Sequence, residues 1–382
     1  MSKNADGPLS NYTVVDLTRI LAGPWCTRRL ADLGARVIKV EKPPVGANER
    51  PDQWAHAGYN YGKESIALDW MNVDQDKEIF FKLLDNSDVL IENFRAGTMA
   101  GLGLTWEYIH ARWPKLIYCS ISGYGSSGPN YQRPAMDPVI QGSSGIMAIT
   151  GNGDQIAMTE GLGDINAGLH ATIGIQAALL SRVRDGEGRF VDISMNDAAV
   201  TLLQANVSKF ADPESVFKGG EPVRDGTRGR AMTPFQAYYC GDGKPVCIVA
   251  YNRKDWPIFC QYVLEKPELE KDERFRSNGR RLKNIEALTV EIENAFKNKT
   301  RDEVMAIMSK YKLASGPVNS LEDVFNDEQL NHRNMLAEVI NEKGKKLIVP
   351  GNPIKISGFP DSKIKPNAPA LDEHGDKIRS SL

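Results

Sequence analysis

The segment Gly161–Gly168 (GLGDINAG) places one carboxylate, Asp164, among glycines at the start of a long apolar run. The run Ile165–Val183 predicts a helix, so Asp164 falls at its N-terminal end. An Asp in this position is typical of a helix N-cap. The glycines favour a second interpretation, because bare backbone lets a bulky reactant approach the carboxylate. A helix N-terminus also favours the ionised form, and an ionised carboxylate is a recognised covalent nucleophile.

Other chemistries have weaker support. Glu41 follows the second predicted strand, where a dinucleotide-binding fold carries its acidic ribose ligand. However, Gly23 is the only glycine between Thr18 and Pro24, and a pyrophosphate turn needs three, so an oxidoreductase is disfavoured. We then expect Glu41 to be a solvated strand end. No Gly-x-Ser-x-Gly elbow or Walker loop occurs, and no two histidines are spaced as metal ligands.

Composition narrows the partners. The 47 Lys and Arg against 49 Asp and Glu give a net charge of −2, which argues against nucleic acid and membrane surfaces but allows a small phosphorylated ligand. The 5 cysteines are an odd number without a Cys-x-x-Cys pair, which indicates reduced thiols in the cytoplasm. The N-terminus has no apolar signal region, and no run is long enough for a membrane span.

The elements that must position Asp164 alternate between strand and helix. Short apolar runs predict strands at 12–18, 36–41, 88–91, 115–122 and 189–195, and amphipathic runs predict helices at 27–33, 77–84, 105–112 and 165–183. This alternation predicts an α/β fold with a parallel sheet.

A Gly-, Pro- and charge-rich stretch at 210–230 is the candidate domain boundary. Beyond it, the runs 235–239 and 245–249 flank Gly-Asp-Gly and predict a hairpin. Helical patterns follow at 256–264 and 283–295, so this part suits a smaller α+β domain.

An ordered series of motifs runs nearly end to end and resembles one family, the class III CoA-transferases of the CaiB/BaiF type. That family includes formyl-CoA, acetyl-CoA:oxalate and succinyl-CoA:glutarate CoA-transferases, together with 2-methylacyl-CoA racemases. The motifs that carry the resemblance stand at 16–24, 33–41, 63–69, 92–97, 122–129, 163–168, 188–192, 316–318 and 350–353.

The resemblance implies an architecture. Residues 1–209 and 331–382 would form a discontinuous, Rossmann-like, CoA-binding large domain, and residues 210–330 a small α+β domain with linkers. Two such subunits would interlock as a homodimer.

The resemblance also implies a reaction, in which an acyl-CoA thioester is a substrate and no cofactor is permanently bound. Asp164 matches the family's nucleophile in Gly-Asp-x-Asn-x-Gly, so it would form an aspartyl mixed anhydride and then an aspartyl-CoA thioester. Lys42 and Arg95 would meet CoA phosphates, unless they are ordinary solvated surface charges. The positions expected to contact the CoA substrate are Ile20, Leu21, Lys42, Leu68, Asp69, Trp70, Met71, Asn93, Phe94, Arg95, Met136 and Asp137.

The chain departs from its relatives at several positions. Leu21 stands where formyl-CoA transferases have a Gln that holds a small dicarboxylate. Met136 stands where the racemases have a histidine, and a thioether cannot transfer a proton as that histidine does. Gly226–Gly229 stands near the place of a tetraglycine loop without reproducing it. Asp137 would lie near Asp164 or serve as a turn residue before Pro138. A racemase or epimerase and a non-catalytic acyl-CoA binder therefore remain alternatives, and the donor and acceptor acids stay open.

Overall fold

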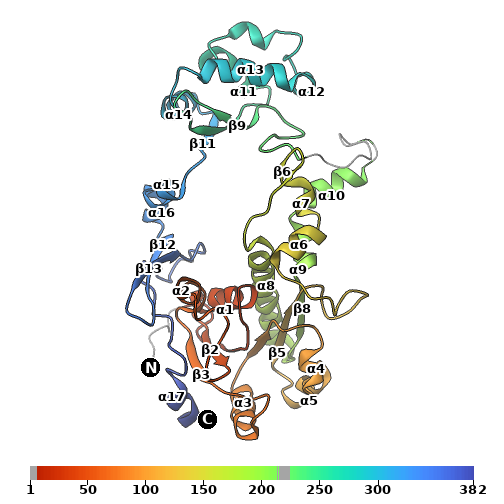
Figure 1. Cartoon of the computed structure of the whole chain (residues 1–382), viewed down its shortest axis with the longest axis vertical. Helices are drawn as coiled ribbons and strands as arrows, with labels where there is room; N and C mark the ends of the chain where they lie inside the picture. Colours follow the sequence, from red (N-terminus) through yellow and green to blue (C-terminus); the bar gives the residue numbers. More distant parts are fainter. Residues whose placement is uncertain (1–6, 213, 215–223) are drawn as a thin grey trace. The chain divides into compact units, whose positions relative to one another are not determined.

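The structure is a computed structural model that describes residues 7–212, 214 and 224–382 (Figure 1). The described residues form two compact units. Unit 1 comprises Met1–Met147, Met158–Gln204 and Asp327–Leu382, and unit 2 comprises Ala148–Ala157 and Ala205–Asn326. Both ends of the chain thus belong to one unit. Most of the Gly- and Pro-rich stretch expected at 210–230 lies outside the described residues.

Unit 1 is built on a six-stranded sheet in the order β3-β2-β1-β4-β5-β8, with all five strand pairs parallel. Its strands are β1 (Thr13–Asp16), β2 (Arg36–Glu41), β3 (Glu64–Ala67), β4 (Val89–Glu92), β5 (Ile117–Ser122) and β8 (Phe190–Ser194). The parallel α/β prediction is therefore confirmed. β3 is the one strand that the apolar pattern did not predict, because its four residues ESIA are too short a run.

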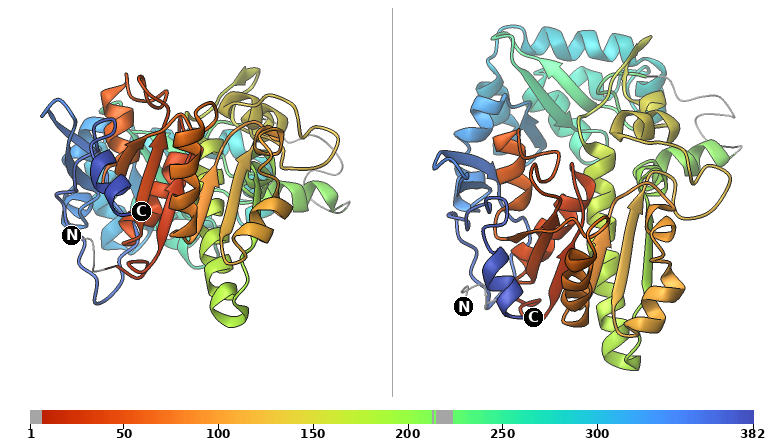
Figure 2. Two further views of the ribbon diagram at one scale, coloured as in Figure 1. Left: turned by 90° about the horizontal axis from the view of Figure 1, so that it is seen from below. Right: turned by 60° about the horizontal axis from the view of Figure 1, so that its bottom comes forward.

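Helices cover both faces of this sheet. The helix α8 (Leu162–Asp185) packs on β5 and β8 and against α1 (Ala22–Asp32). The opposite face buries an apolar cluster between the sheet and the helices α3 (Asp74–Asp85), α5 (Trp106–Arg112) and α17 (Gly375–Ser380). Figure 2 shows the long yellow-green α8 and the orange helices on opposite sides of the strands.

The rest of unit 1 consists of a β-hairpin with its helix and several shorter helices. The helix α2 (Gln53–Asn60) packs on the hairpin of β12 (Leu336–Ile340) and β13 (Lys346–Pro350). Shorter helices are α4 (Thr98–Gly101), α6 (Asp137–Ser143), α7 (Ile146–Ile149, shared with unit 2), α9 (Met195–Thr201) and α16 (Glu328–His332).

Unit 2 confirms the predicted hairpin, with β9 (Phe235–Tyr239) antiparallel to β10 (Pro245–Val249) and β11 (Ala314–Pro317) added beyond β10. Its separate apolar core is wrapped by helices. The helical elements are α10 (Gln204–Ala211), α11 (Asp255–Ile258), η1 (Phe259–Val263), η2 (Pro267–Glu270), α12 (Asn278–Lys283), α13 (Ile285–Phe296), α14 (Arg301–Lys310) and α15 (Leu321–Phe325), with a small ribbon of β6 (Gly151–Asn152) and β7 (Gln155–Ile156). Thr300 and Glu303 form a capping box at α14.

Among the helices of the described chain, none has the length and apolar character needed to cross a bilayer.

Candidate active site

The crevice of the sheet lies where the strand order reverses, between β1 and β4. Open α/β sheets bind ligands outside the carboxyl ends of the strands at this point. Here the loops that follow the two strands are tied together by Asn93. Its side chain accepts from the Arg19 N–H (2.9 Å) and donates to the Arg19 carbonyl (2.7 Å). The predicted ligand positions after β1 and β4 therefore belong to one rigid edge.

The chain turns sharply from β1 into α1 at Ile20, whose φ of 70° is left-handed. This conformation is strained for a β-branched residue, so its surroundings must hold it. The buried Glu49 accepts from the Ile20 N–H (3.0 Å) and lies 3.2 Å from the Lys39 ammonium. Glu49 thus fixes the turn that presents Ile20 and Leu21. The early turn also explains why α1 begins at Ala22, ahead of the helix predicted from residue 27.

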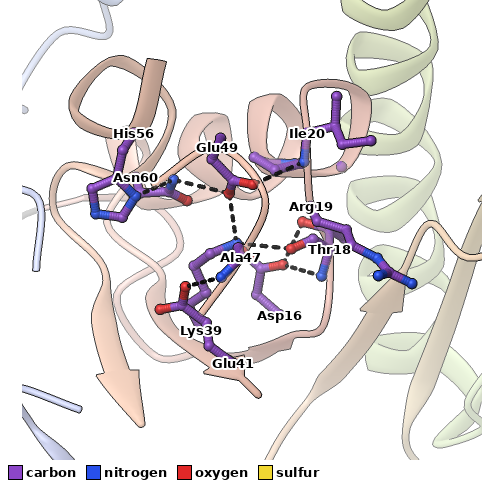
Figure 3. A network of polar contacts seen from close by, with 12 residues as sticks. Asp16, Thr18, Arg19, Ile20, Lys39, Glu41, Ala47, Glu49, His56 and Asn60 are labelled. Atoms are coloured by element: carbon purple, nitrogen blue, oxygen red, sulfur yellow. Dashed lines mark hydrogen bonds and ion pairs between the residues drawn. The ribbon is translucent and has the colours of Figure 1, made fainter. Parts of the chain in front are cut away.

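Beneath this turn lies a buried polar network, drawn in Figure 3. Asp16 accepts from the Thr18 N–H (2.8 Å) and from the Lys63 ammonium (3.1 Å). Although burial alone would raise the pKa of Asp16, Lys63 and Lys39 outweigh it and hold that pKa below its usual value.

Glu41 belongs to the same network, so its prediction as a solvated strand end was wrong. Glu41 is 4 % exposed, and its carboxylate pairs with Arg50 and accepts from the Ala47 N–H (2.9 Å). Burial raises the pKa of Glu41, but Arg50 and Lys39 lower it further, to about 2. This carboxylate is occupied by its own protein and has no capacity left for a ribose.

The predicted ligand positions after β2 and β3 line a shared hollow beside the crevice. It is bounded by Lys42, the stretch Leu68–Met71 and Phe94. Lys42 is largely exposed, and its ammonium lies 3.4 Å from an Asp69 carboxylate oxygen. Lys42 is therefore weakly held and free to turn toward an anion.

The remaining predicted positions line hollows that reach Asp164. One of these, the arginine-lined hollow, is bounded by Ile20, Leu21, Ala22, Asn93, Phe94, Arg95, Ala96, Ile121, Ser122, Gly123, Tyr131, Arg133, Ala135, Met136, Asp164 and Met195. The structure thus gathers the predicted residues along one edge of the sheet. Arg133 adds a second guanidinium that sequence reasoning missed, although it stands in the stretch that contains Met136.

Asp164 is not the N-cap of α8, so that interpretation was wrong. The N-cap is Gly161, with a left-handed φ of 73°, and Asp164 is the third residue of the helix. The buried Asp137 does the capping instead. Its carboxylate accepts from the backbone N–H groups of Gly161 (3.0 Å), Gly163 (2.7 Å) and Asp164 (3.4 Å). Gln141 donates to the same carboxylate (2.7 Å), so Asp137 is far more than a turn residue.

The two glycines before Asp164 are needed for packing. A Cβ on Gly161 would lie 2.9 Å from Leu21, and one on Gly163 would lie 3.0 Å from the Asp137 carboxylate. Gly168 lets α8 approach α1, because a Cβ there would lie 2.6 Å from the Ala22 carbonyl oxygen. The glycines therefore place Asp164 indirectly, by bringing α8 against α6 and α1.

The electrostatics of Asp164 also differ from the expectation that the helix N-terminus would favour its ionised form. Burial, followed by the negative charge of Asp137, raises the pKa of Asp164 to about 7. Because Asp137 occupies the first N–H groups of α8, these donors are not available to the Asp164 side chain. Asp164 is thus a carboxyl group that titrates near neutral pH, which is typical of catalytic groups.

A second hollow at Asp164 contains most of the residues that sequence reasoning missed. This acid-lined hollow, of about 530 Å³, is bounded by Ile20, Leu21, Asn48, Glu49, Asp52, Trp54, Ala55, Tyr59, Met136, Asp137, Pro138, Met158, Glu160, Gly161 and Asp164. Its α2 residues carry no motif, and only the folded chain brings them to Asp164. Within the described chain, no cluster of His, Cys, Asp and Glu could hold a metal ion.

Comparisons with known proteins agree with this site. The model of CoA-transferase family III matches residues 9–375. An acetyl-CoA:oxalate CoA-transferase of Acetobacter aceti is 37% identical, over 98% of this chain and 96% of that protein. A succinyl-CoA:mesaconate CoA-transferase of Haloarcula hispanica is 34% identical, over 96% of this chain and 94% of that protein.

The fold has solved counterparts as well. The crystal structure of a CaiB/BaiF family protein from Brucella suis superimposes with a TM-score of 0.82 at 34% identity, covering 98% of this chain and 99% of that one. The chain therefore belongs to CoA-transferase family III. It is an enzyme of the CoA-transferase class, and a CoA thioester is its substrate.

Proposed function

We propose that the enzyme transfers CoA between an acyl-CoA and a free carboxylic acid, with Asp164 as the covalent nucleophile. The observation that carries the proposal is a single titratable carboxyl group placed where two hollows meet, each lined by predicted CoA-contact positions. We ascribe CoA binding to unit 1, because all of these positions belong to it. Lys42, Arg95 and Arg133 would pair with CoA phosphates.

The proposed reaction runs in two matched halves. The Asp164 carboxylate attacks the thioester carbonyl and expels CoA thiolate, which leaves a mixed anhydride between Asp164 and the acyl group. The thiolate then attacks the aspartyl carbonyl, releases the donor acid and leaves an aspartyl-CoA thioester. The acceptor carboxylate reverses both steps. Each step breaks one acyl bond and makes another, so no oxidant or net proton transfer is needed.

The raised pKa suits this chemistry. A carboxylate without a paired cation is a stronger nucleophile than one held in an ion pair, and a pKa raised to about 7 leaves an ionised population of Asp164 near neutral pH. Asp164 is half-buried, so the bound acyl-CoA would complete the exclusion of water from the reactive intermediates, which would otherwise hydrolyse.

Chemical trapping tests the proposal. The enzyme is incubated with an acyl-CoA and hydroxylamine, which converts an aspartyl anhydride or thioester into a hydroxamate. Peptide mass spectrometry is expected to find the hydroxamate at Asp164, with none when the acyl-CoA is omitted. An enzyme that turns over with Asp164 unmodified would overturn the proposal.

Two alternatives make different predictions. A racemase needs a group that moves the substrate's α-proton, and the exposed Met136 cannot do so. Uptake of deuterium from solvent at the substrate's α-carbon, in the absence of an acceptor acid, would favour the racemase. A non-catalytic binder would keep its affinity for acyl-CoA in Asp164→Ala and would show no transfer in the wild type.

We also propose that two chains associate as a homodimer. The outer face of α8 carries a stripe of exposed apolar residues, Leu169, Ile173, Leu180 and Val183, at helical spacing. Such a stripe is costly in water and typical of an interface. Light scattering is expected to give twice the mass of one chain, and Ile173→Lys with Leu180→Lys is expected to reduce it. A wild-type monomer at micromolar concentration would contradict this proposal.

A further inference from the structure

The two hollows that meet at Asp164 have opposite electrostatic character. The arginine-lined hollow contains Arg95 and Arg133, together with the amide of Asn93. The acid-lined hollow contains Asp52 and Glu160, and no Lys, Arg or His is among the described residues that bound it. Both hollows share Ile20, Leu21, Met136 and Asp164, so a substrate bound at Asp164 can extend into each of them.

This difference in charge favours a different part of an acyl-CoA in each hollow. Coenzyme A carries several phosphate charges, which favour the hollow with guanidinium groups. The acyl chain then points from the thioester carbonyl, at Asp164, into the acid-lined hollow. Because the second half-reaction reverses the first, the acceptor acid must place its body in the same space.

The acid-lined hollow offers apolar contacts and uncompensated negative charge. Trp54, Tyr59, Pro138 and Met158 contribute aromatic and aliphatic surface. Glu49 is neutralised by Lys39, and Asp137 is occupied by backbone N–H groups. No ion pair within the described part of the chain neutralises Asp52 or Glu160, however.

One group in the hollow, Tyr59, responds to the charge of Glu160. Burial, followed by the charges of Glu160 and Asp164, raises the pKa of the Tyr59 hydroxyl. The groups that act on the pKa of Asp164 include Asp137 but no cation. A second carboxylate entering here would lose water and meet repulsion without gaining a partner.

We propose that the acid-lined hollow selects acids with an uncharged body, so that the enzyme moves CoA between monocarboxylic acids and discriminates against dicarboxylic ones. This inference rests on the proposed function. It runs opposite to what the relatives' names would suggest, because oxalate and mesaconate each carry two carboxylates. The selection applies equally to the donor acyl group and to the acceptor acid.

Chain-matched pairs of acids test the inference. Butyryl-CoA and succinyl-CoA serve as donors, and butyrate, hexanoate, succinate and adipate serve as acceptors, with CoA esters separated by chromatography. We expect kcat/KM to be about 10-fold to 100-fold higher for each monocarboxylate than for its matched dicarboxylate. Equal or better use of the dicarboxylates would overturn the selectivity while leaving CoA transfer intact. No transfer between any pair, with no hydroxamate at Asp164, would instead count against the proposed function.

Charge-altering variants locate the selectivity. Glu160→Gln and Met158→Lys lower the negative charge of the hollow. Each is expected to reduce the ratio of kcat/KM for a monocarboxylate to kcat/KM for its matched dicarboxylate by at least about fivefold. Glu78→Gln, an exposed change on α3, is the control and is expected to leave the ratio unchanged. An unchanged ratio in both hollow variants would show that the acid-lined hollow does not hold the acyl body.

Discussion

Asp16 and Asp164 are both carboxyl groups of unit 1, the first fully buried and the second half-buried, yet their protonation behaviour is opposite. Asp16 sits in the buried network of Figure 3, where Lys63 and Lys39 hold its pKa below the usual value in spite of burial. Asp164 is half-buried next to another carboxylate, Asp137, and its pKa is raised to about 7. The more deeply buried of the two groups thus has the lower pKa, so the neighbouring charges decide the direction of the shift.

The comparison separates a carboxylate that stabilises the fold from one that is available to react. A buried carboxylate surrounded by cations and N–H donors is fixed, and its removal destabilises the fold because the buried cations lose their partner. A buried carboxylate without a cation destabilises the fold when it ionises, but it is available to react. Substitutions at these two residues and their neighbours should therefore change different measured quantities.

The largest effect is expected from Asp164→Asn. An amide cannot attack the thioester, so kcat should fall by about 10⁴-fold or more, as for removal of other covalent nucleophiles. Transfer is measured by CoA-ester chromatography, with Glu78→Gln, an exposed carboxylate of α3 outside both hollows, as the control. Retention of more than about a tenth of the activity would mean that Asp164 is not the nucleophile.

Asp16→Asn should act on stability. The change leaves the buried Lys63 without its carboxylate partner, which should lower the free energy of unfolding by about 3–5 kcal/mol at pH 7. Urea unfolding followed by circular dichroism measures this loss. A loss below about 1 kcal/mol would show that the network contributes little net stability.

Asp164→Asn, unlike Asp16→Asn, should raise the free energy of unfolding at alkaline pH. Because the folded-state pKa lies above the unfolded value, the stability that this group contributes is complete below pH ~4 and is lost as the pH rises through about 7. The neutral amide avoids that loss. We expect the variant to exceed the wild type by about 1–3 kcal/mol at pH 8 and to match it at pH ~4. A variant less stable than the wild type at pH 8 would contradict the assignment of Asp164 as an uncompensated charge.

Glu49 links the two regions, because it joins Lys39 of the network to the strained Ile20 turn of the site. Glu49→Gln weakens both contacts, so the turn should loosen and kcat/KM for acyl-CoA should fall by about tenfold, mainly through KM. Glu64→Gln is the matched control. It removes an ion pair between the first residue of β3 and Arg36, away from the Ile20 turn, and should leave KM unchanged. A fall in kcat alone would place Glu49 outside substrate positioning.

The smallest effect is expected from Asp137→Asn. In the wild type, kcat/KM should rise with pH and level off above about 7 as Asp164 ionises. Asparagine still accepts from the N–H groups of α8 but removes the repelling charge, so the pKa of Asp164 falls. The rising limb of the pH profile should shift to lower pH by about 0.5–1 unit. An unmoved profile would exclude Asp137 as a cause of the raised pKa.

Much of the fold could be predicted because its signals are local. The apolar runs at 12–18, 36–41 and 115–122 each lie between turn residues, and all three form parallel strands. The Asp164 motif was also local, since its residues are consecutive. Strand β3 escaped because four residues carry too little pattern.

The electrostatics could not be predicted, because they depend on residues far apart in the chain. Asp137 reaches the N–H of Asp164 across 27 positions, and Lys39 neutralises Glu49 from a neighbouring strand. Glu41 looked solvated because its partner Arg50 follows a Pro- and Gly-rich loop that has no periodic pattern. Such pairings appear only when the sheet has brought the loops together.

The most direct test follows the oxygen atoms of the acceptor. In the proposed reaction the acceptor carboxylate attacks the aspartyl-CoA carbonyl, and one of its oxygens remains on Asp164 after the new acyl-CoA leaves. The enzyme is turned over with an acyl-CoA and an acceptor acid labelled with ¹⁸O, and its peptides are analysed by mass spectrometry. We predict that the label enters Asp164 and is absent from Asp16 and Asp137. Turnover that leaves Asp164 unlabelled would show that CoA passes between the acids without a bond to Asp164.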